Sequence, residues 1–380
     1  MGNIDSRAQF GNGYLQAACD QPFYEPGQTV TGKVYVRLIN NIADAKCVQI
    51  KIRGKEKGSW WETFHRNVRY TDGRTVYQQV TEKRKSRKDF FSGSVSLHDF
   101  QAGASKGDYV FPFQFQLSEN IPSSFFYKNS HIKKKPKAQV KYCIKASLET
   151  RSDHNEMQYK QVLIVREKPD QAVMEKIAKI SEQKVTTWCC VNQGTSKIEV
   201  QFDKNTFFPY EQVKCKVELN NGKCNIPMTA VRFSVEQELS INCHNHIFRD
   251  LIVIKEKQEN GAPARHDKNE ERELEVDLSQ IKYQVPAHRN KGGKHVQFSL
   301  EDAFQMSQAQ PDCHGSIIKN DYYLAVRTVF DGCTCCAELP KVRIPLNILP
   351  VINPQLANFA PPNDYNPKDH EITKITFNKN

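Results

Sequence analysis

Cysteine and histidine clusters are the residues of this chain whose types and spacing come closest to a chemical site. Cys243, His244 and His246 supply the soft and borderline ligands that bind zinc, and Cys313-His314 adds a second pair. A third cluster, Asp-Gly-Cys-Thr-Cys-Cys, occupies residues 331–336. Cys333 and Cys336 have the Cys-x2-Cys spacing of structural zinc sites, but the sequence offers no second such pair to complete one. We therefore predict no metal site, and keep a metal- or redox-responsive regulator built on Cys243, His244 and His246 as an alternative.

Motifs for catalysis are missing from the sequence. There is no Gly-x-Ser-x-Gly nucleophile elbow, no phosphate-binding Gly-x4-Gly-Lys-[Ser/Thr] loop and no His-Glu-x-x-His zinc motif. No Gly-x-Gly-x-x-Gly follows a predicted strand either. We expect a protein that is not an enzyme, with no catalytic residue and no cofactor.

The first residues match a lipidation signal. Gly2 followed by Ser6 fits the N-myristoylation pattern, in which Gly2 becomes the terminal residue after Met1 is removed. An ordinary polar tail is the alternative. A single myristoyl chain binds membranes only marginally, so this reading requires a second membrane signal.

Two basic runs are candidates for that second signal. Their cationic residues are Lys83, Arg84, Lys85, Arg87 and Lys88 in the first run, and Lys133, Lys134, Lys135 and Lys137 in the second. The whole chain carries 54 Lys and Arg against 43 Asp and Glu, a net charge of +11. Each cation near an anionic leaflet contributes about 1 kcal/mol of binding.

We predict that these runs bind an anionic membrane surface, with plain solvated loops as the alternative. A basic run also matches nuclear localisation signals. No aromatic residues interrupt either run and no RNA- or DNA-binding motif occurs, so nucleic acid is not an expected partner.

The elements that must position these residues are predicted to be strands. Apolar residues alternate with polar ones at 29–38, 110–117, 213–219 and 342–348, which is typical of strands in antiparallel sandwiches. Residues 170–182 have near-helical spacing, so we expect a linker helix or a loose connector there. Both halves open with aromatics before a proline turn and a strand, which favours a tandem pair of similar domains.

Length and composition agree with a globular chain of several domains. The 380 residues suggest two or three domains, and 38% hydrophobic residues suffice for cores. No run approaches the ~18 apolar residues of a membrane span, and the N-terminus has no apolar leader segment. We expect neither an integral membrane protein nor a secretory signal. The 12 cysteines are then expected to be mostly thiols.

Several motifs in order make the chain recognisable. The first half contains Tyr24-x-Pro26-Gly27, Phe111-Pro112-Phe113-x-Phe115 and Ile121-Pro122-Ser123, and the second half contains Cys189-Cys190, Pro209, Tyr322-x-Leu324-x-Val326 and Leu339-Pro340. In this order the motifs resemble the α-arrestin, or arrestin-domain-containing, family over about residues 15–350. The resemblance implies an all-β fold of two tandem arrestin-like, immunoglobulin-like antiparallel β-sandwich domains.

The expected domain organisation has five parts. A flexible N-terminus covers 1–14, the N domain covers 15–168 and a linker covers 169–187. The C domain covers 188–350, and a disordered, proline-containing tail covers 351–380.

Family resemblance also implies a function. It predicts an adaptor for membrane-protein trafficking, in endocytic or endosomal sorting, that binds cytoplasmic tails of membrane proteins. Its expected location is cytoplasmic, peripherally associated with the plasma membrane or endosomes. A retromer-type arrestin-fold coat subunit is the alternative. By the same resemblance Cys335 and Cys336 lie in a C-domain loop that touches membrane, which suggests S-acylation there.

The tail holds an imperfect docking motif. Many α-arrestins carry Pro-Pro-x-Tyr, which binds WW domains of ubiquitin ligases, whereas here Pro361 and Pro362 are separated from Tyr365 by two residues. One extra residue rotates the tyrosine by about a third of a turn of a polyproline II helix. We expect it to miss its slot, and recruitment of a WW-domain ubiquitin ligase stays open.

Overall fold

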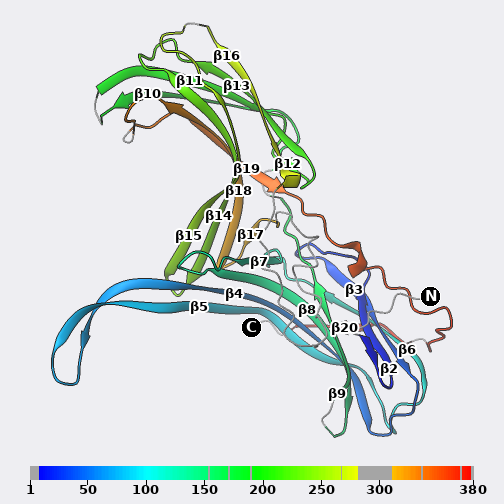
Figure 1. Cartoon of the computed structure of the whole chain (residues 1–380). Helices are drawn as coiled ribbons and strands as arrows, with labels where there is room; N and C mark the ends of the chain where they lie inside the picture. The colour runs from blue at the N-terminus through cyan, green and yellow to red at the C-terminus, as the bar shows by residue number, and fades with distance from the viewer. Residues whose placement is uncertain are drawn as a thin grey trace.

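A computed structural model shows a chain made almost entirely of strands (Figure 1). It describes residues 8–152, 155–169, 172–188, 191–266, 268–280, 310–334, 337–368 and 370–377. Short 3-10 turns occur at Leu278–Gln280 and Pro354–Leu356. Within the described residues, no helix has the length and apolar character required to cross a bilayer. The expected all-β class and tandem-sandwich architecture are confirmed.

The N-terminal sandwich pairs two sheets. One sheet has the order β1 (Gln9–Phe10), β2 (Gly13–Cys19), β3 (Thr29–Leu38), β6 (Gly107–Gln116) and β20 (Thr373–Ile375). The other has the order β5 (Thr75–Asp99), β4 (Ala45–Arg69), β8 (Lys137–Thr150) and β7 (Phe125–Lys128), with β9 (Asn155–Leu163) beside β8. Phe111, Phe113 and Phe115 alternate onto the inner face and are almost completely buried, as the sequence pattern predicts.

The C-terminal sandwich repeats the plan with different strand lengths. Its first sheet contains β10 (Ile177–Thr187), β11 (Val191–Phe202), β13 (Gln212–Asn220) and β16 (Glu270–Asp277). Its second contains β12 (Thr206–Phe207), β19 (Lys341–Ile348), β18 (Ile318–Phe330), β14 (Met228–Cys243) and β15 (His246–Asn260), with β17 (Cys313–His314) on β18. Val200, Phe202, Val217, Phe233 and Leu324 lie fully buried between them.

Of the linker helix or loose connector predicted at 170–182, the helix is wrong, and only residues 172–176 form an irregular connector. Strand β10 begins at Ile177 and pairs antiparallel with β11 along its whole length. Only four apolar residues suggested a helix, and the backbone hydrogen bonds offered by the edge of β11 outweigh so weak a preference. The C-terminal sandwich therefore begins about ten residues before the predicted end of the linker.

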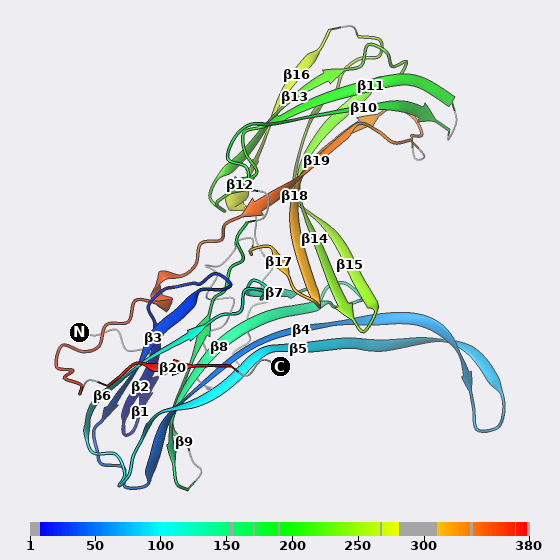
Figure 2. The same ribbon diagram turned by 180° about the vertical axis from the view of Figure 1, so that it is seen from behind.

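The expectation of a disordered tail is also wrong for the residues the structure describes. After β19 the chain returns along the N-terminal sandwich, where β20 pairs in parallel with β6 (Figure 2). Ile352, Leu356 and Ile375 are each less than 10% exposed. The composition is polar, but a few apolar side chains suffice because the sandwich already supplies the surface on which they pack.

The two sandwiches share one continuous core at their junction. Ile241, Cys243 and Ile318 of the C-terminal sandwich pack into the core of the N-terminal one. The carboxylate of Glu56, which is fully buried, accepts hydrogen bonds from the backbone N–H groups of Ile317 (3.0 Å) and Ile318 (2.7 Å). Buried carboxylates are costly unless satisfied in this way, so the junction is specific rather than a loose contact.

Candidate functional site

The hairpin of β4 and β5 is the most prominent projection of the molecule (Figure 1). Each strand is 25 residues long, and β8 accompanies β4 only as far as the pair Ser59–Lys137. Just beyond it, the N–H of Trp61 donates to the carbonyl of Lys134 at 2.7 Å. From Trp61 to residue 83 the hairpin is a two-stranded ribbon, and isolated ribbons of this kind are only marginally stable in water. A two-stranded ribbon of this length that extends beyond the sheet is a candidate surface for contact with a binding partner.

The two faces of the ribbon differ in exposure. Residues directly opposite in an antiparallel ladder share a face, and successive residues alternate between faces. Along the ribbon, odd-numbered residues of both strands are exposed, and most even-numbered ones are half-buried. The even face points toward the C-terminal sandwich, where the rings of Trp60 and Phe248 lie 6.1 Å apart.

Charges on the even face are paired. Arg84 binds Glu62 at 2.6 Å and Glu82 at 3.1 Å, and Arg66 binds Glu82 at 3.0 Å. Glu62 also contacts the Nδ1 of His246 at 3.0 Å, and its pKa is lowered because the Arg84 and His246 bonds outweigh burial. This face is therefore close to neutral, and most of its charged side chains form ion pairs within the molecule.

The odd face belongs to a much larger cationic surface. It continues onto the solvent side of the whole β5-β4-β8 sheet, opposite the buried side that carries Ile50, Ile52 and Tyr142. We call this the lysine face. Its cations, placed on one side by the ladder register, are Lys51, Arg53, Lys55, Lys57, Arg69, Lys83, Lys85, Arg87, Lys128, Lys137, Lys141, Lys145 and Lys160.

Acidic residues are scarce on the lysine face. From Lys51 to the ribbon tip, the ladder places one carboxylate there, Asp89, which binds Arg53 (3.4 Å) and Arg87 (2.7 Å). The pKa of Lys55 is lowered, first by burial and then by the neighbouring charges of Lys57, Arg53 and Lys160. Burial thus disfavours the charged form of Lys55 most, and its cationic neighbours add to that effect.

The two sequence-predicted basic runs come together, but only part of each faces the same way. Lys83, Lys85, Arg87 and Lys137 lie on the lysine face, and Arg84 lies on the opposite one. Lys88 is paired opposite the buried Glu56, with its Nζ 5.9 Å from the Phe90 ring.

Lys133, Lys134 and Lys135 form the turn before β8. The Nζ of Lys134 lies over the rings of Trp60 (5.9 Å) and Phe248 (5.7 Å), so this residue contributes to the domain junction. The two basic runs of the sequence therefore predict the correct part of the N-terminal sandwich, but they include only four of the cations of the lysine face.

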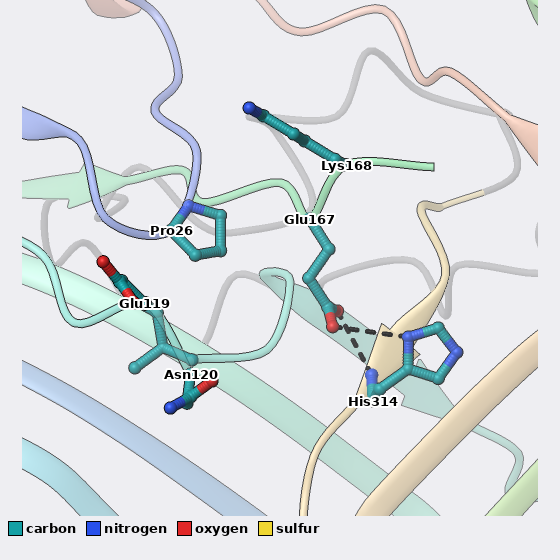
Figure 3. A pocket seen from close by; sticks show the side chains of 7 residues that line it. Pro26, Glu119, Asn120, Glu167, Lys168 and His314 are labelled. Carbon is teal, nitrogen blue, oxygen red and sulfur yellow. Dashed lines mark hydrogen bonds and ion pairs between the residues drawn. The ribbon is translucent and has the colours of Figure 1, made fainter. Parts of the chain in front are cut away.

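A second candidate site is a cavity of about 450 Å³ at the domain junction. Figure 3 shows Pro26, Glu119, Asn120, Glu167, Lys168 and His314 around it. His314 donates its backbone N–H to Glu167 (3.1 Å), and its ring lies 3.3 Å from Glu167 and 2.8 Å from Asp321. Asp321 first and then Glu167 raise the pKa of His314 to about 10.

A third acid of this cluster is Asp312. Burial raises its pKa to about 8, and the nearby negative charge of Asp321 adds to the effect. Both shifts favour the protonated forms, a neutral Asp312 carboxyl and a positively charged His314 ring. The arrangement ties the two sandwiches together. Ser123 donates its hydroxyl to Glu167 at 3.0 Å, and the neighbouring Cys313 thiol is fully buried, which raises its pKa well above the ordinary value.

Cys243, His244 and His246 do not converge. The Sγ of Cys243 is buried against the carbonyl of Gly58 at 3.6 Å, and burial raises its pKa to about 11. His244 and His246 are exposed in the turn beyond it, and His246 points to Glu62. No group of three metal-binding side chains occurs in the part of the chain that the structure describes. The geometry gives the alternative metal site no support.

Tyr365 of the imperfect tail motif is packed inward. Its N–H donates to the carbonyl of Pro362 at 2.9 Å, so the motif forms a turn instead of a polyproline II helix. Its hydroxyl donates to the carbonyl of Tyr109, and its ring lies 5.5 Å from the Arg37 guanidinium. Pro361 and Pro362 are half-buried beside it. A WW domain has no access to this tyrosine while the tail is docked.

Three predicted lipidation residues, Gly2, Cys335 and Cys336, lie outside the described residues. Cys333 and Thr334 are the last described residues before that cysteine pair. S-acylation and N-myristoylation remain predictions.

Comparison with protein families accounts for both sandwiches. The model of the arrestin (or S-antigen) N-terminal domain matches residues 15–171, and that of the arrestin C-terminal domain matches residues 192–353. The predicted boundaries, 15–168 and 188–350, lie within a few residues of these matches.

Curated relatives point the same way. The chain is 24% identical over 213 residues to Arrestin domain-containing protein A of Dictyostelium discoideum, covering 56% of this chain and 35% of that protein. It is 27% identical over 210 residues to Arrestin domain-containing protein 5 of Homo sapiens, covering 53% and 55%. The chain spans about half, or less, of the length of these relatives. The two domain matches together with these relatives show that the chain belongs to the arrestin-domain-containing protein family.

Proposed function

We propose that this protein is a non-enzymatic adaptor in membrane-protein trafficking. It binds cytoplasmic tails of cargo proteins during endocytic or endosomal sorting and works at a cytoplasmic membrane face. Members of its family are typically adaptors, and one observation of this chain supports that role directly. Its N-terminal sandwich holds an extended segment, β20, as an added strand along β6.

The contacts of β20 are those of strand addition. Thr373, Lys374 and Ile375 are in parallel register with 113–115, and Ile375 is 4% exposed. Phe377 follows, with its ring 4.9 Å from that of Phe91. In such recognition the backbone supplies affinity, and pockets for alternate side chains supply selectivity. The edge of β6 is therefore built to hold an extended peptide with apolar residues two positions apart.

A peptide-binding experiment tests the proposal. Ile375→Asp places a charge in a buried pocket and displaces β20, whereas the control Ile372→Asp changes a side chain that is 58% exposed. An array of cytoplasmic-tail peptides is measured by fluorescence anisotropy against both full-length variants. We expect apolar-alternating peptides to bind Ile375→Asp about tenfold more tightly or better than the control. If no tail peptide binds either variant, this edge is not a cargo site.

Ubiquitin-ligase recruitment is a finer part of the proposal. It requires Tyr365 to leave its contacts with Tyr109 and Arg37, so binding of a WW domain should be stronger in Ile375→Asp than in the control. Affinity purification from gently solubilised membranes, with Gly2 left free, separates the alternatives. Stoichiometric recovery of coat subunits in place of cargo and ligase would favour the coat-subunit reading.

A further inference from the structure

We infer that the lysine face is the surface with which this protein lies against an anionic lipid bilayer. This inference rests on the proposed location at a membrane, and it identifies the surface responsible. The bound partner is the lipid headgroup array itself, contacted through many separate cations on one sheet face.

The lysine face is long and spans four strands. Along β4 it extends from Lys51 to Arg69, which at about 3.4 Å per residue is about 60 Å. Across the strands it runs from Lys160 on β9 through β8 and β4 to Lys85 on β5. The C-terminal sandwich packs on the opposite side, through Glu56 and Trp60, so it does not obstruct approach of this side to a flat surface.

The charge of the face fits an anionic partner. Lys51, Lys57, Lys83 and Lys85 form no ion pair with any described residue, whereas the cations of the even ribbon face, Arg66 and Arg84, are neutralised. These unpaired lysines keep their charge available for an external partner. Each such cation near a leaflet adds about a fivefold factor in affinity.

The kind of cation favours lipid over nucleic acid. Ten of the thirteen cations of the face are lysines, and two of the three arginines, Arg53 and Arg87, are paired to Asp89. Lysine is a mobile point charge that suits a fluid array of headgroups, whereas the recognition of base edges in nucleic acid favours the rigid fork of arginine.

Two exposed aromatic residues complete the surface. Trp61 (38% exposed) and Tyr77 (68% exposed) lie on the odd face of the ribbon, among its cations. The Nζ of Lys83 lies 6.0 Å from the Trp61 ring, and Tyr77 stacks on His65 at 5.4 Å. Amphipathic rings of this type are enriched at the headgroup level of membranes. The ribbon thus reaches the bilayer with both charge and interfacial side chains.

The test is vesicle co-sedimentation of the full chain. The probe is phosphatidylcholine vesicles with and without about 30 mol% phosphatidylserine. The variant K51Q/K57Q/K83Q/K85Q removes four cations of the lysine face without touching the core. We expect it to bind the anionic vesicles about 600-fold more weakly than wild type, and wild-type binding to fall with added salt.

A matched control removes the same charge elsewhere. K179Q/K184Q/K223Q/K341Q changes four exposed lysines of the C-terminal sandwich. This control should bind within about threefold of wild type. Equal loss in both variants would mean that net charge alone matters, and would overturn the assignment of a site.

Trp61 gives an independent readout of orientation. In a W188F background, Trp60 is buried and Trp61 is the exposed indole. Its emission should shift to the blue on anionic vesicles and be quenched by headgroup-labelled lipid. No shift, or tighter binding to a duplex competitor than to vesicles at equal salt, would overturn the bilayer assignment. Cargo-peptide binding is measured in the same quadruple variant, so a failed adaptor role and a failed membrane surface give different results.

Discussion

The hairpins β4–β5 and β14–β15 occupy comparable places in the two sandwiches, but only the tip of β14–β15 packs against the other sandwich (Figure 1). The tip of β14–β15, at residues 243–246, packs against β4: Cys243 contacts Gly58, and His246 contacts Glu62. The tip of β4–β5 is closed by its own residues, with the N–H of Tyr70 donating to the carbonyl of Arg74 at 2.8 Å. One hairpin fixes the domain junction, and the other is left to meet a partner.

Their exposed side chains differ accordingly. The outer strand of the C-terminal hairpin exposes Ile247, Leu251 and Val253, whereas the N-terminal ribbon exposes lysines with two aromatic rings. The same backbone motif therefore supports adhesion within the molecule in one case and contact with a charged surface in the other. Variants at the junction should alter stability, and variants on the lysine face should alter binding alone.

The largest effect is expected at Glu56. Replacing it by leucine leaves the backbone N–H groups of Ile317 and Ile318 buried without an acceptor, and the exposed Ser316 loses its bond to the carboxylate. We expect a loss of about 3–5 kcal/mol in the free energy of unfolding, measured by urea denaturation. The control Glu273→Leu alters an exposed residue of β16. Similar losses in both variants would refute the role assigned to Glu56.

Gly58 should come next. A Cβ at this position would meet the Cγ2 atoms of Ile241 (2.5 Å) and Ile317 (2.7 Å), because the C-terminal hairpin packs directly on the backbone here. Gly58→Val should cost about 1–3 kcal/mol and separate the sandwiches in small-angle scattering. Gly11→Val, where no atom lies within 4 Å, serves as the control.

Tyr365 tests the docked tail. Its removal leaves the Arg37 guanidinium and the rings of Tyr14 and Tyr35 without their cover. Tyr365→Ala should cost about 1–2 kcal/mol and make residues 353–377 sensitive to limited proteolysis. Tyr210→Ala, at a ring that is 63% exposed, should leave proteolysis unchanged. An equally resistant tail in both variants would show that Tyr365 does not hold it.

The smallest of these stability effects is a dependence on pH. The pKa of His314 is raised from 6.5 to about 10, so its stabilising contribution is complete below about pH 6.5 and is lost as the pH rises through about 10. Asp312, raised from 3.8 to about 8, acts in the same direction between about pH 4 and 8. The melting temperature should fall between pH 6.5 and 10, and His314→Gln should flatten that slope. A steeper slope in the variant would contradict the assignment.

Sequence patterns predicted the sandwiches because each strand carries its own period-2 alternation, as in 29–38 and 110–117. They failed where partners distant in the chain decide the structure. The segment 170–182 became a strand because β11 lies beside it, and Tyr365 became buried because β3 and β6 supply its pocket.

The functional surface was only partly predictable for the same reason. Contiguous basic runs are visible in any sequence, but the lysine face is built from single cations at odd-numbered positions of β4, β5 and β8, together with Lys128 of β7 and Lys160 of β9. The alternation of Lys51, Lys55 and Lys57 was a usable signal. Which of its faces is exposed, and that Glu167 meets His314 across 147 residues, follow only from the fold.

Amide hydrogen exchange of the full chain, with and without anionic vesicles, tests the central claim most directly. The account predicts added protection in the ribbon, residues 61–83, and in the adjoining strand β8, with no change in β14–β15. Protection confined to β15, where Ile247, Leu251 and Val253 are exposed, or absent from the ribbon, would contradict it.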